Sequence, residues 1–265
     1  MSSNISPMAY VNPKARLGEN VTIYPFAFID EDVEIGDNCV IMPNVSIMSG
    51  TRMGSGNKVY QGAVIGADPQ DFRWKGEKTY CYIGNNNIIR EQVIINRGIR
   101  ATGGTSIGND TFIMANAHIA HDSVIKGKCV IGNSVKVAGN VEVDECVILS
   151  SAVILHEGSK VGKWAMIKGG CRINGNVPPY VIIAHNPASY YGINAWVMRK
   201  KGFSDAQVDD VAKSYRHIYQ CGTSVFNALQ RVEADIADSD VRREILDFIR
   251  KVNLKIVAVP IDETF

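Results

Sequence analysis

The sequence predicts a left-handed parallel β-helix built from hexapeptide repeats, followed by a C-terminal α-helical domain. Three observations predict this fold. An aliphatic residue recurs every six positions between Val11 and Ile173, a small or β-branched residue follows four positions later, and glycine often follows the aliphatic residue directly. A period of six is neither helical nor a heptad. Short flat strands joined by tight corners let both apolar positions point inward.

The aliphatic positions stay in phase from Val11 to Ile65, resume at Ile83, and run unbroken from Ile107 to Ile173. Three repeat units close one triangular coil. The pattern resembles that of the hexapeptide-repeat proteins, and this resemblance implies the left-handed form of the helix, a known exception to the right-handed crossover rule. Each coil contacts only its neighbours, so the prism is rigid and its outer edges are available for sites. We assign residues 1–190 to the β-helix and residues 191–265 to the helical domain.

Two segments interrupt the repeat. Residues 68–82 (DPQDFRWKGEKTYCY) are polar and aromatic, and residues 96–106 (NRGIRATGGTS) are rich in glycine. Long loops on a rigid scaffold usually carry function.

The repeat is expected to end at residues 177–180 (VPPY), because two prolines cannot donate to a strand ladder. A short connecting segment, residues 181–199, should follow. Ser204 and Gln207 then form a capping box at the start of a helix whose apolar stripe reaches Gly222. Two more helices are predicted near residues 225–234 and 241–252.

Composition narrows the function. The chain has 265 residues, 46% of them hydrophobic and 21% charged, and a formal net charge of +1, which argues against disorder and against a global attraction to nucleic acid. No apolar run is long enough to span a membrane, and the first residues lack the basic start and apolar stretch of a secretory signal. We therefore expect a cytoplasmic protein without stable membrane insertion.

The six cysteines form no CxxC pair. Cys39, Cys129 and Cys171 share one phase of the repeat, a slot otherwise filled by small residues. They are therefore interpreted as core residues rather than disulfide or zinc partners.

The stretch NAHIAHD, residues 116–122, is the strongest candidate for chemistry. With three repeat units per coil, Gly139 should stack beside His121, one strand spacing away, and Glu157 should lie one coil further. The column also takes in the neighbouring residues Asn140 and His156. Gly103, one coil before His121, places the glycine-rich loop beside this column, so we expect a cleft there.

His121 is suited to act as a general base, with its tautomer set by Asp122 or by a nearby carbonyl. The backbone amide at Gly139 is suited to stabilise an oxyanion. Neither Ser nor Cys is in register as a nucleophile, so direct acyl transfer to a hydroxyl is the simpler mechanism. The alternative is a zinc site formed by His118, His121 and His156, as in carbonic anhydrases built from the same repeat.

Several further motifs make a resemblance specific. They are QDFRWKGE (70–77), INRG (95–98), NAHIAHD (116–122), VPPYVI (177–182), GIN (192–194) and RKKGFS (199–204). With the repeat, they resemble the UDP-N-acetylglucosamine acyltransferases, the LpxA family of lipid A biosynthesis, over nearly the whole chain.

The resemblance implies transfer of an R-3-hydroxyacyl chain from acyl carrier protein to the 3-hydroxyl of UDP-N-acetylglucosamine, the first step of lipid A biosynthesis, without a cofactor or metal. It also implies a homotrimer with each active site between two prisms. By the same resemblance, His121 is the base, Asp122 orients it, and the Gly139 amide binds the oxyanion. The implied substrate-binding residues are Gln70, Asp71, Arg73, His118, Asn140, His156, Glu157, Gly169, Asn194, Lys200 and Lys201.

Some of these positions depart from the usual family pattern. Arg73 stands in place of lysine, Asn140 in place of histidine, Glu157 in place of glutamine, and the pair Lys200 and Lys201 in place of two arginines. Pro187 replaces a histidine associated with measuring the acyl chain, whereas Gly169 keeps the floor of that channel open. The base is retained, so the reaction class is unchanged, and a long acyl chain is favoured.

A basic cluster is expected to meet the acidic carrier protein; it comprises Arg199, Lys200, Lys201, Lys213 and Arg216. Two other functions stay open at this point. One is the related N-acyltransferase of the same pathway, which usually has an extra N-terminal domain. The other is a hexapeptide scaffold or zinc-binding carbonic anhydrase homologue without transferase activity.

Overall fold

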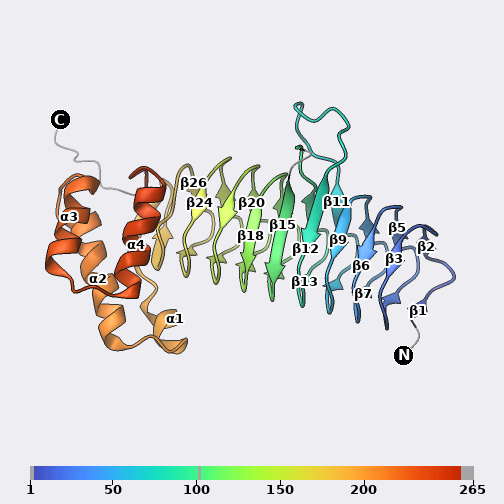
Figure 1. The fold of residues 1–265 in the computed structure, drawn as a ribbon, viewed down its shortest axis with the longest axis horizontal. Coiled ribbons are helices and arrows are strands. Elements are labelled where there is room, and N and C mark those ends of the chain that lie inside the picture. Colours follow the sequence, from blue (N-terminus) through green and yellow to red (C-terminus); the bar gives the residue numbers. More distant parts are fainter. Residues whose placement is uncertain (1–2, 101–102, 258–265) are drawn as a thin grey trace.

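The computed structural model describes residues 3–100 and 103–257. Its short strands stack into three sheets, named here A, B and C. Figure 1 shows the coils along the long axis of the molecule and the helices at its C-terminal end. The predicted hexapeptide β-helix with C-terminal helices is therefore confirmed.

The chain visits the three sheets in turn. Sheet A contains, in spatial order, β1 (Asn4–Ile5), β4 (Thr22–Ile23), β7 (Val40–Ile41), β10 (Lys58–Val59), β13 (Ile88–Ile89), β16 (Phe112–Ile113), β19 (Val130–Ile131), β22 (Ile148–Leu149), β25 (Met166–Ile167), β27 (Val181–Ala184) and β28 (Ser189–Ile193). Sheet B contains β2 (Tyr10–Val11), β5 (Phe28–Ile29), β8 (Ser46–Ile47), β11 (Val64–Ala67), β14 (Ile94–Asn96), β17 (His118–Ile119), β20 (Lys136–Val137), β23 (Ile154–Leu155) and β26 (Arg172–Ile173). Sheet C contains β3 (Arg16–Leu17), β6 (Glu34–Ile35), β9 (Thr51–Met53), β12 (Tyr80–Ile83), β15 (Gly104–Asn109), β18 (Val124–Gly127), β21 (Glu142–Val143) and β24 (Lys160–Val161).

The register shows why the six-residue pattern builds this prism. Thr22 pairs with Val40, its counterpart three repeat units later, and the second residue of almost every two-residue strand is buried. Many corners need a left-handed backbone, which Asn and Asp tolerate better than most residues. Asn116, Asp122 and Asn140 have φ values of 61°, 55° and 57°. The Asn and Asp residues that turn the chain therefore also lie at the outer edges of the prism.

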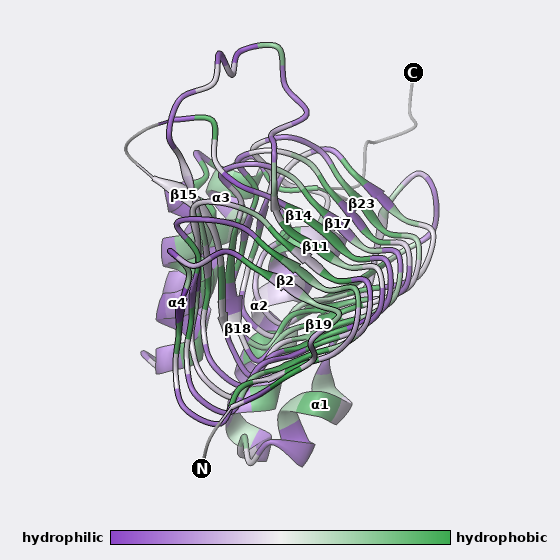
Figure 2. Cartoon of the chain, turned by 90° about the vertical axis from the view of Figure 1, so that its right-hand side faces the viewer, coloured by the Kyte–Doolittle hydropathy of each residue, from purple (hydrophilic) through white to green (hydrophobic). Residues whose placement is uncertain are grey.

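The two predicted interruptions are loops at one vertex of the prism, between sheets B and C (Figure 2). The first loop covers residues 68–79, because residues 80–82, predicted as loop, belong to β12, where Cys81 is buried. The second lies between β14 and β15, so its predicted ends at residues 96 and 104–106 are also strand residues. Residues 101 and 102 of this predicted loop lie outside the described residues.

The predicted end of the repeat at residues 177–180 is wrong. Val177 bridges to Val161, and β27 then pairs in parallel with β25. The prolines are tolerated because they occupy the corner between these two pairings, where no ladder donor is required. Residues 181–199 were expected to be a short connecting segment. They instead form β27, its antiparallel partner β28, and most of the short helix α1 (Ala195–Lys200). Strand β28 crosses residue 190, and the domain boundary placed there stays a prediction.

The three predicted helices are present as α2 (Asp205–Gln220), α3 (Val225–Asp235) and α4 (Asp240–Lys251). Ser204 and Gln207 form the predicted capping box at the start of α2. Tyr215 anchors the helices to the last coil, since its hydroxyl donates to the Pro179 carbonyl oxygen at 2.5 Å. None of the helices in the described part of the chain is long and apolar enough to cross a membrane.

The three cysteines that share one phase of the repeat occupy the positions expected of core residues. Cys39, Cys129 and Cys171 are buried free thiols. Burial raises the pKa of the Cys129 thiol to about 11. At neutral pH this side chain is therefore an uncharged, unreactive packing group.

Candidate active site

The residues predicted to form a column meet at the vertex between sheets B and C. His121 turns the corner after β17, Gly139 the corner after β20, and Glu157 the corner after β23. Each corner is one coil further along the prism. The loop over residues 68–79 leaves the same vertex, as Figure 2 shows, and brings Asp71 and Arg73 back over His121.

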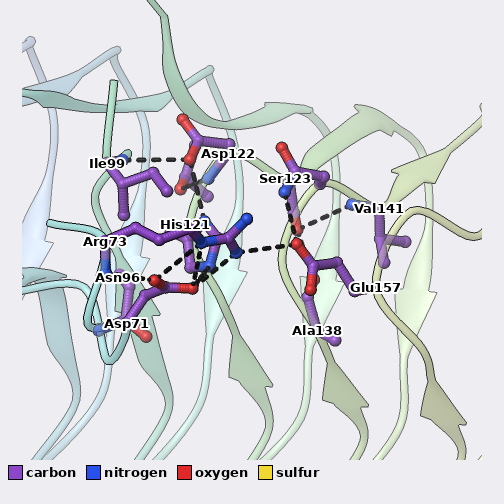
Figure 3. Close-up of polar contacts among 12 residues, drawn as sticks. Asp71, Arg73, Asn96, Ile99, His121, Asp122, Ser123, Ala138, Val141 and Glu157 are labelled. Atoms are coloured by element: carbon purple, nitrogen blue, oxygen red, sulfur yellow. Dashed lines mark hydrogen bonds and ion pairs between the residues drawn. The ribbon is translucent and has the colours of Figure 1, made fainter. Parts of the chain in front are cut away.

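The His121 side chain is buried and lies between two carboxylates (Figure 3). Its Nδ1 is 2.9 Å from Oδ2 of Asp122. Asp122 is itself fixed, because Oδ2 accepts from the Ile99 amide at 3.1 Å and its own amide donates to Thr105 Oγ1 at 2.9 Å. A carboxylate accepts hydrogen bonds, so Nδ1 donates to Asp122, and in the neutral ring with this tautomer Nε2 has the lone pair that a base needs. When Nε2 is protonated as well, it donates to the second carboxylate, that of Asp71.

The Nε2 atom of His121 lies 3.2 Å from Oδ2 of Asp71. Arg73 holds this carboxylate through both of its oxygens, with Nε at 2.9 Å from Oδ1 and an NH2 group at 2.7 Å from Oδ2. The same guanidinium reaches Oε1 of Glu157 at 2.9 Å. Hydrogen bonds from Arg73 keep the pKa of Asp71 well below its usual range and also lower the pKa of Glu157, so both side chains are ionised at neutral pH.

Gly139 lies directly against the His121 ring. The Asn140 amide donates to the His121 carbonyl oxygen at 3.1 Å, which confirms the predicted stacking of these corners. A methyl group placed on Gly139 would be 2.4 Å from Cε1 and 2.6 Å from Nε2 of the ring, closer than any real contact. Only glycine leaves room for the ring at this position.

His118 faces a different partner. Its Nε2 is 2.7 Å from Oδ1 of Asn96, and the Asn96 amide in turn donates to the Asp68 carbonyl oxygen at 2.6 Å. Burial, and secondarily the charge of Lys136, lower the pKa of His118. A neutral His118 therefore ties β17 to the start of the first loop. Among the described residues, no three His, Cys, Asp or Glu side chains are grouped so as to hold a metal ion.

The lowered pKa of His118 predicts a pH-dependent contribution to stability. An unfolded histidine, with a pKa of about 6.5, takes up a proton that the folded site disfavours. The contribution is therefore complete above about pH 6.5 and is lost as the pH falls through the lower folded value. We expect the melting temperature of the wild type, relative to His118→Gln, to decrease between pH 7.5 and pH 5. An unchanged difference across this range would contradict the assignment.

Comparison with known proteins places the chain in a family. Residues 176–257 match the family model "Udp N-acetylglucosamine O-acyltransferase; Domain 2", and residues 32–67 and 104–139 match the model of six bacterial transferase hexapeptide repeats. An acyl-[acyl-carrier-protein]–UDP-N-acetylglucosamine O-acyltransferase of Stutzerimonas stutzeri is 39% identical over 236 residues, which cover 89% of this chain and 92% of the relative. The chain belongs to the LpxA family.

Solved structures of the LpxA family agree in fold. The LpxA crystal structure from Bacteroides fragilis superposes with a TM-score of 0.93 at 46% sequence identity, covering 95% of this chain and 99% of that one. The Acinetobacter baumannii LpxA structure gives a TM-score of 0.90 at 32% identity, covering 96% and 98%. The likeness extends over the β-helix and the helices together.

Three residues assigned by resemblance to the LpxA family lie away from this vertex. Asn194 precedes α1 and is buried, with its side-chain amide donating to the Trp164 carbonyl oxygen at 3.0 Å. Lys200 and Lys201 end the same helix and are exposed. In Figure 2, α1 lies on the side of sheet A, opposite the two loops. One chain therefore does not bring these residues to His121.

The remaining predicted residues of the LpxA-type site are on the surface. Gln70 is exposed beside Asp71, and His156 is exposed beside Glu157. Gly169 is also exposed, and a methyl group there would be 3.0 Å from the Ser151 carbonyl oxygen. Gln70 and His156 border the vertex between sheets B and C, whereas Gly169 turns the corner from β25 to β26, between sheets A and B.

The basic cluster proposed to meet the carrier protein is partly neutralised. Arg199 pairs with Asp205 and Lys213 pairs with Asp209, each at 3.0 Å. The local positive charge of this cluster is consequently smaller than the sequence suggested.

Sequence analysis missed Asn96 and Thr105, which hold His118 and Asp122 in place. Both residues flank the second loop, where the step between paired residues becomes longer than a regular coil, as for Ile94 and His118. Counting in regular coils therefore could not align them with the column. Asn96 lies in the INRG motif at residues 95–98, and the signal for Thr105 was its position as a polar residue at the end of a loop.

Proposed function

We propose that His121 is the general base in direct transfer of an R-3-hydroxyacyl chain from acyl carrier protein to the 3-hydroxyl of the sugar. The chain is a UDP-N-acetylglucosamine O-acyltransferase of the first step of lipid A biosynthesis. The observation that supports this mechanism is the His121 ring, whose Nδ1 is bound to Asp122 while Nε2 faces Asp71 beneath the first loop.

The geometry suits a sugar acceptor. Nε2 of His121 and the Asp71 carboxylate are 3.2 Å apart, similar to the spacing of two neighbouring hydroxyls on a sugar ring. One hydroxyl would donate to Nε2 and the next to Asp71. As the first oxygen attacks the thioester carbon, its proton passes to Nε2, and the same proton then reaches the departing thiolate sulfur.

Gly139 supports the proposed stabilisation of negative charge. Its amide hydrogen has no acceptor within residues 3–100 and 103–257, and its lack of a side chain lets the His121 ring lie directly beside this amide. An amide directed at the thioester oxygen would stabilise the oxyanion formed during attack. Because the transferred group passes straight from donor to acceptor, no covalent acyl-enzyme is required.

A trimer would complete this site. The outward side chains of sheet A form an apolar row, here called the sheet A row: Ile88, Phe112, Val130, Ile148 and Met166. The outward side chains of sheet C are mostly charged, for example Arg16, Glu34 and Lys160. A continuous apolar row on one face favours a protein contact.

Three copies related by a threefold axis would place the sheet A row of one protomer against the B–C vertex of the next. That arrangement would also bring Asn194, Lys200 and Lys201 of a neighbour towards His121. It would provide an apolar wall for the acyl chain. The separation of these residues within one chain is thus accounted for by a site shared between two protomers.

The trimer can be tested at Ile148, in the middle of the sheet A row. We expect the wild type to have about three times the 29.0 kDa mass of the chain by light scattering. Ile148→Glu should shift it to monomer, because the new carboxylate would lose its water in the contact. Val124→Glu, at an outward position of sheet C, is the matched control and should leave the trimer intact. A trimeric Ile148→Glu protein would exclude this contact face.

The transfer reaction is tested with purified protein, UDP-N-acetylglucosamine and 3-hydroxyacyl carrier proteins of several chain lengths. Product from at least one donor supports the proposal and identifies the chain length, which we expect to be long. No product with any donor would direct attention to another acceptor. We also propose a cytoplasmic location, which cell fractionation can check.

A further inference from the structure

The first loop is held to the prism at its two ends and at its middle. Near its start, Arg97 pairs with Asp68 at 2.7 Å and lies over the Trp74 ring at 5.2 Å. At its end, Lys78 pairs with Asp32 at 3.0 Å. Between these points the loop stands away from the coils (Figure 1). In the middle of the loop, Asp71 contacts His121 and Arg73 contacts Glu157.

The donors of Arg73 are shared between two carboxylates. One belongs to Asp71, two positions before it, and the other to Glu157, which is 84 positions away at a corner of the prism. Oε1 of Glu157 also accepts from the Asn140 side-chain amide at 3.1 Å, so the carboxylate is itself oriented. Figure 3 shows Arg73 between Asp71 and Glu157, with its guanidinium directed along the column.

These contacts are poorly suited to a role in stability. The side chains of Arg73 and Glu157 are each 53% exposed, and ion pairs at such exposure contribute little to the free energy of unfolding. They are well suited to orientation, because a planar guanidinium bound at two oxygens fixes the direction of the Asp71 carboxylate. An arginine already engaged by two carboxylates is also a poor phosphate ligand. Orientation is therefore the role that the geometry supports.

We propose that Glu157 is a positioning residue that acts through Arg73: it holds the guanidinium, which holds the Asp71 carboxylate beside Nε2 of His121. Asp71 is then in place for the hydroxyl next to the acceptor. This inference rests on the proposed function, since it assigns Asp71 to the acceptor sugar. It differs from a direct contact between Glu157 and the nucleotide, which would act on substrate affinity.

A double-mutant cycle tests the proposal. In the wild-type background, we expect Glu157→Gln to lower kcat by about tenfold, because small misplacements of catalytic groups are costly, and to change KM for UDP-N-acetylglucosamine by less than about threefold. Arg73→Met should lower kcat at least as much. In the Arg73→Met background, adding Glu157→Gln should lower kcat almost no further, because Glu157 acts through its contact with the Arg73 guanidinium, which this background lacks.

Glu233→Gln is the matched control, because Glu233 pairs with Arg250 at 2.8 Å and is 43% exposed on α3, away from the site. It should leave kcat and KM unchanged. Arg73→Lys keeps the charge without the two-pronged geometry and should be intermediate between wild type and Arg73→Met. Thermal melting of each variant verifies folding.

Three results would overturn the proposal: an equal loss of kcat from Glu157→Gln in both backgrounds, a rise in KM alone, or no effect in the wild-type background. Each leaves wild-type transfer intact and so is distinct from failure of the proposed function, which is absence of transfer by the wild type. An additive loss or a KM effect would indicate that Glu157 contacts the substrate itself.

Discussion

His121→Ala is expected to lower kcat by about two to four orders of magnitude, the usual contribution of a general base. The reason is geometric. The His121 ring directs Nε2 towards Asp71 while Nδ1 is bound to Asp122 at 2.9 Å, and no other described side chain at this vertex combines these two contacts. Initial rates at saturating UDP-N-acetylglucosamine and acyl carrier protein measure the effect.

The backbone contacts that build the corner are retained in His121→Ala, because the carbonyl oxygen of residue 121 still accepts from the Asn140 amide. We therefore expect an unchanged oligomer and little change in melting temperature. His217→Ala, which removes a histidine paired with Asp235 in the helical region, is the control and should keep full activity. A His121→Ala protein that unfolds or dissociates would show that His121 is a structural residue. A folded His121→Ala protein that stays within about tenfold of wild-type turnover would exclude His121 as the base.

Gly139→Ala should lower kcat by at least about a hundredfold through displacement of the His121 ring. The new methyl group would lie 2.4 Å from Cε1, so the ring must move from its place between the Asp122 and Asp71 carboxylates. Overpacking of this kind costs about 1–3 kcal/mol of stability. The melting temperature should therefore fall together with turnover.

The double variant His121→Ala with Gly139→Ala separates the clash from other effects of the methyl group. If the clash is with the ring, removal of the ring should restore the melting temperature to that of His121→Ala alone. Gly139→Ala with turnover within a few-fold of wild type would show that the ring has space that the geometry denies. Failure of the double variant to recover would place the strain in the backbone.

The repeat could be predicted because its information is local. Each coil packs only on its neighbours, so a period of six and three units per coil together define the prism and the column of His121, Gly139 and Glu157. The helices could be predicted for the same reason, since Ser204 and Gln207 cap α2 within its first turn. The last coil was missed because two prolines were interpreted as a stop, although they fill a corner.

The loops could not be predicted in this way, because an insertion destroys the register. Lys58 pairs with Ile88 across the first loop, so these two residues are further apart in sequence than partners in a regular coil. The repeat pattern does not indicate which part of the prism the inserted residues contact. Asp71 contacts His121 from a distant part of the chain, and Arg73 contacts Glu157 from 84 positions away. Sequence analysis assigned these residues to one site through resemblance alone.

The sequence by itself determined the β-helix and its stacked corners, because periodic contacts between adjacent coils follow from spacing. It left the partner of the His121 ring open between Asp122 and a nearby carbonyl, and the structure has Asp122 at Nδ1. Only the tertiary structure decided how the loop closes over His121, that Arg73 bridges two carboxylates, and that Asn194 lies on the side of sheet A. The physical reason is that loop contacts and the faces of the prism depend on where distant segments meet in space.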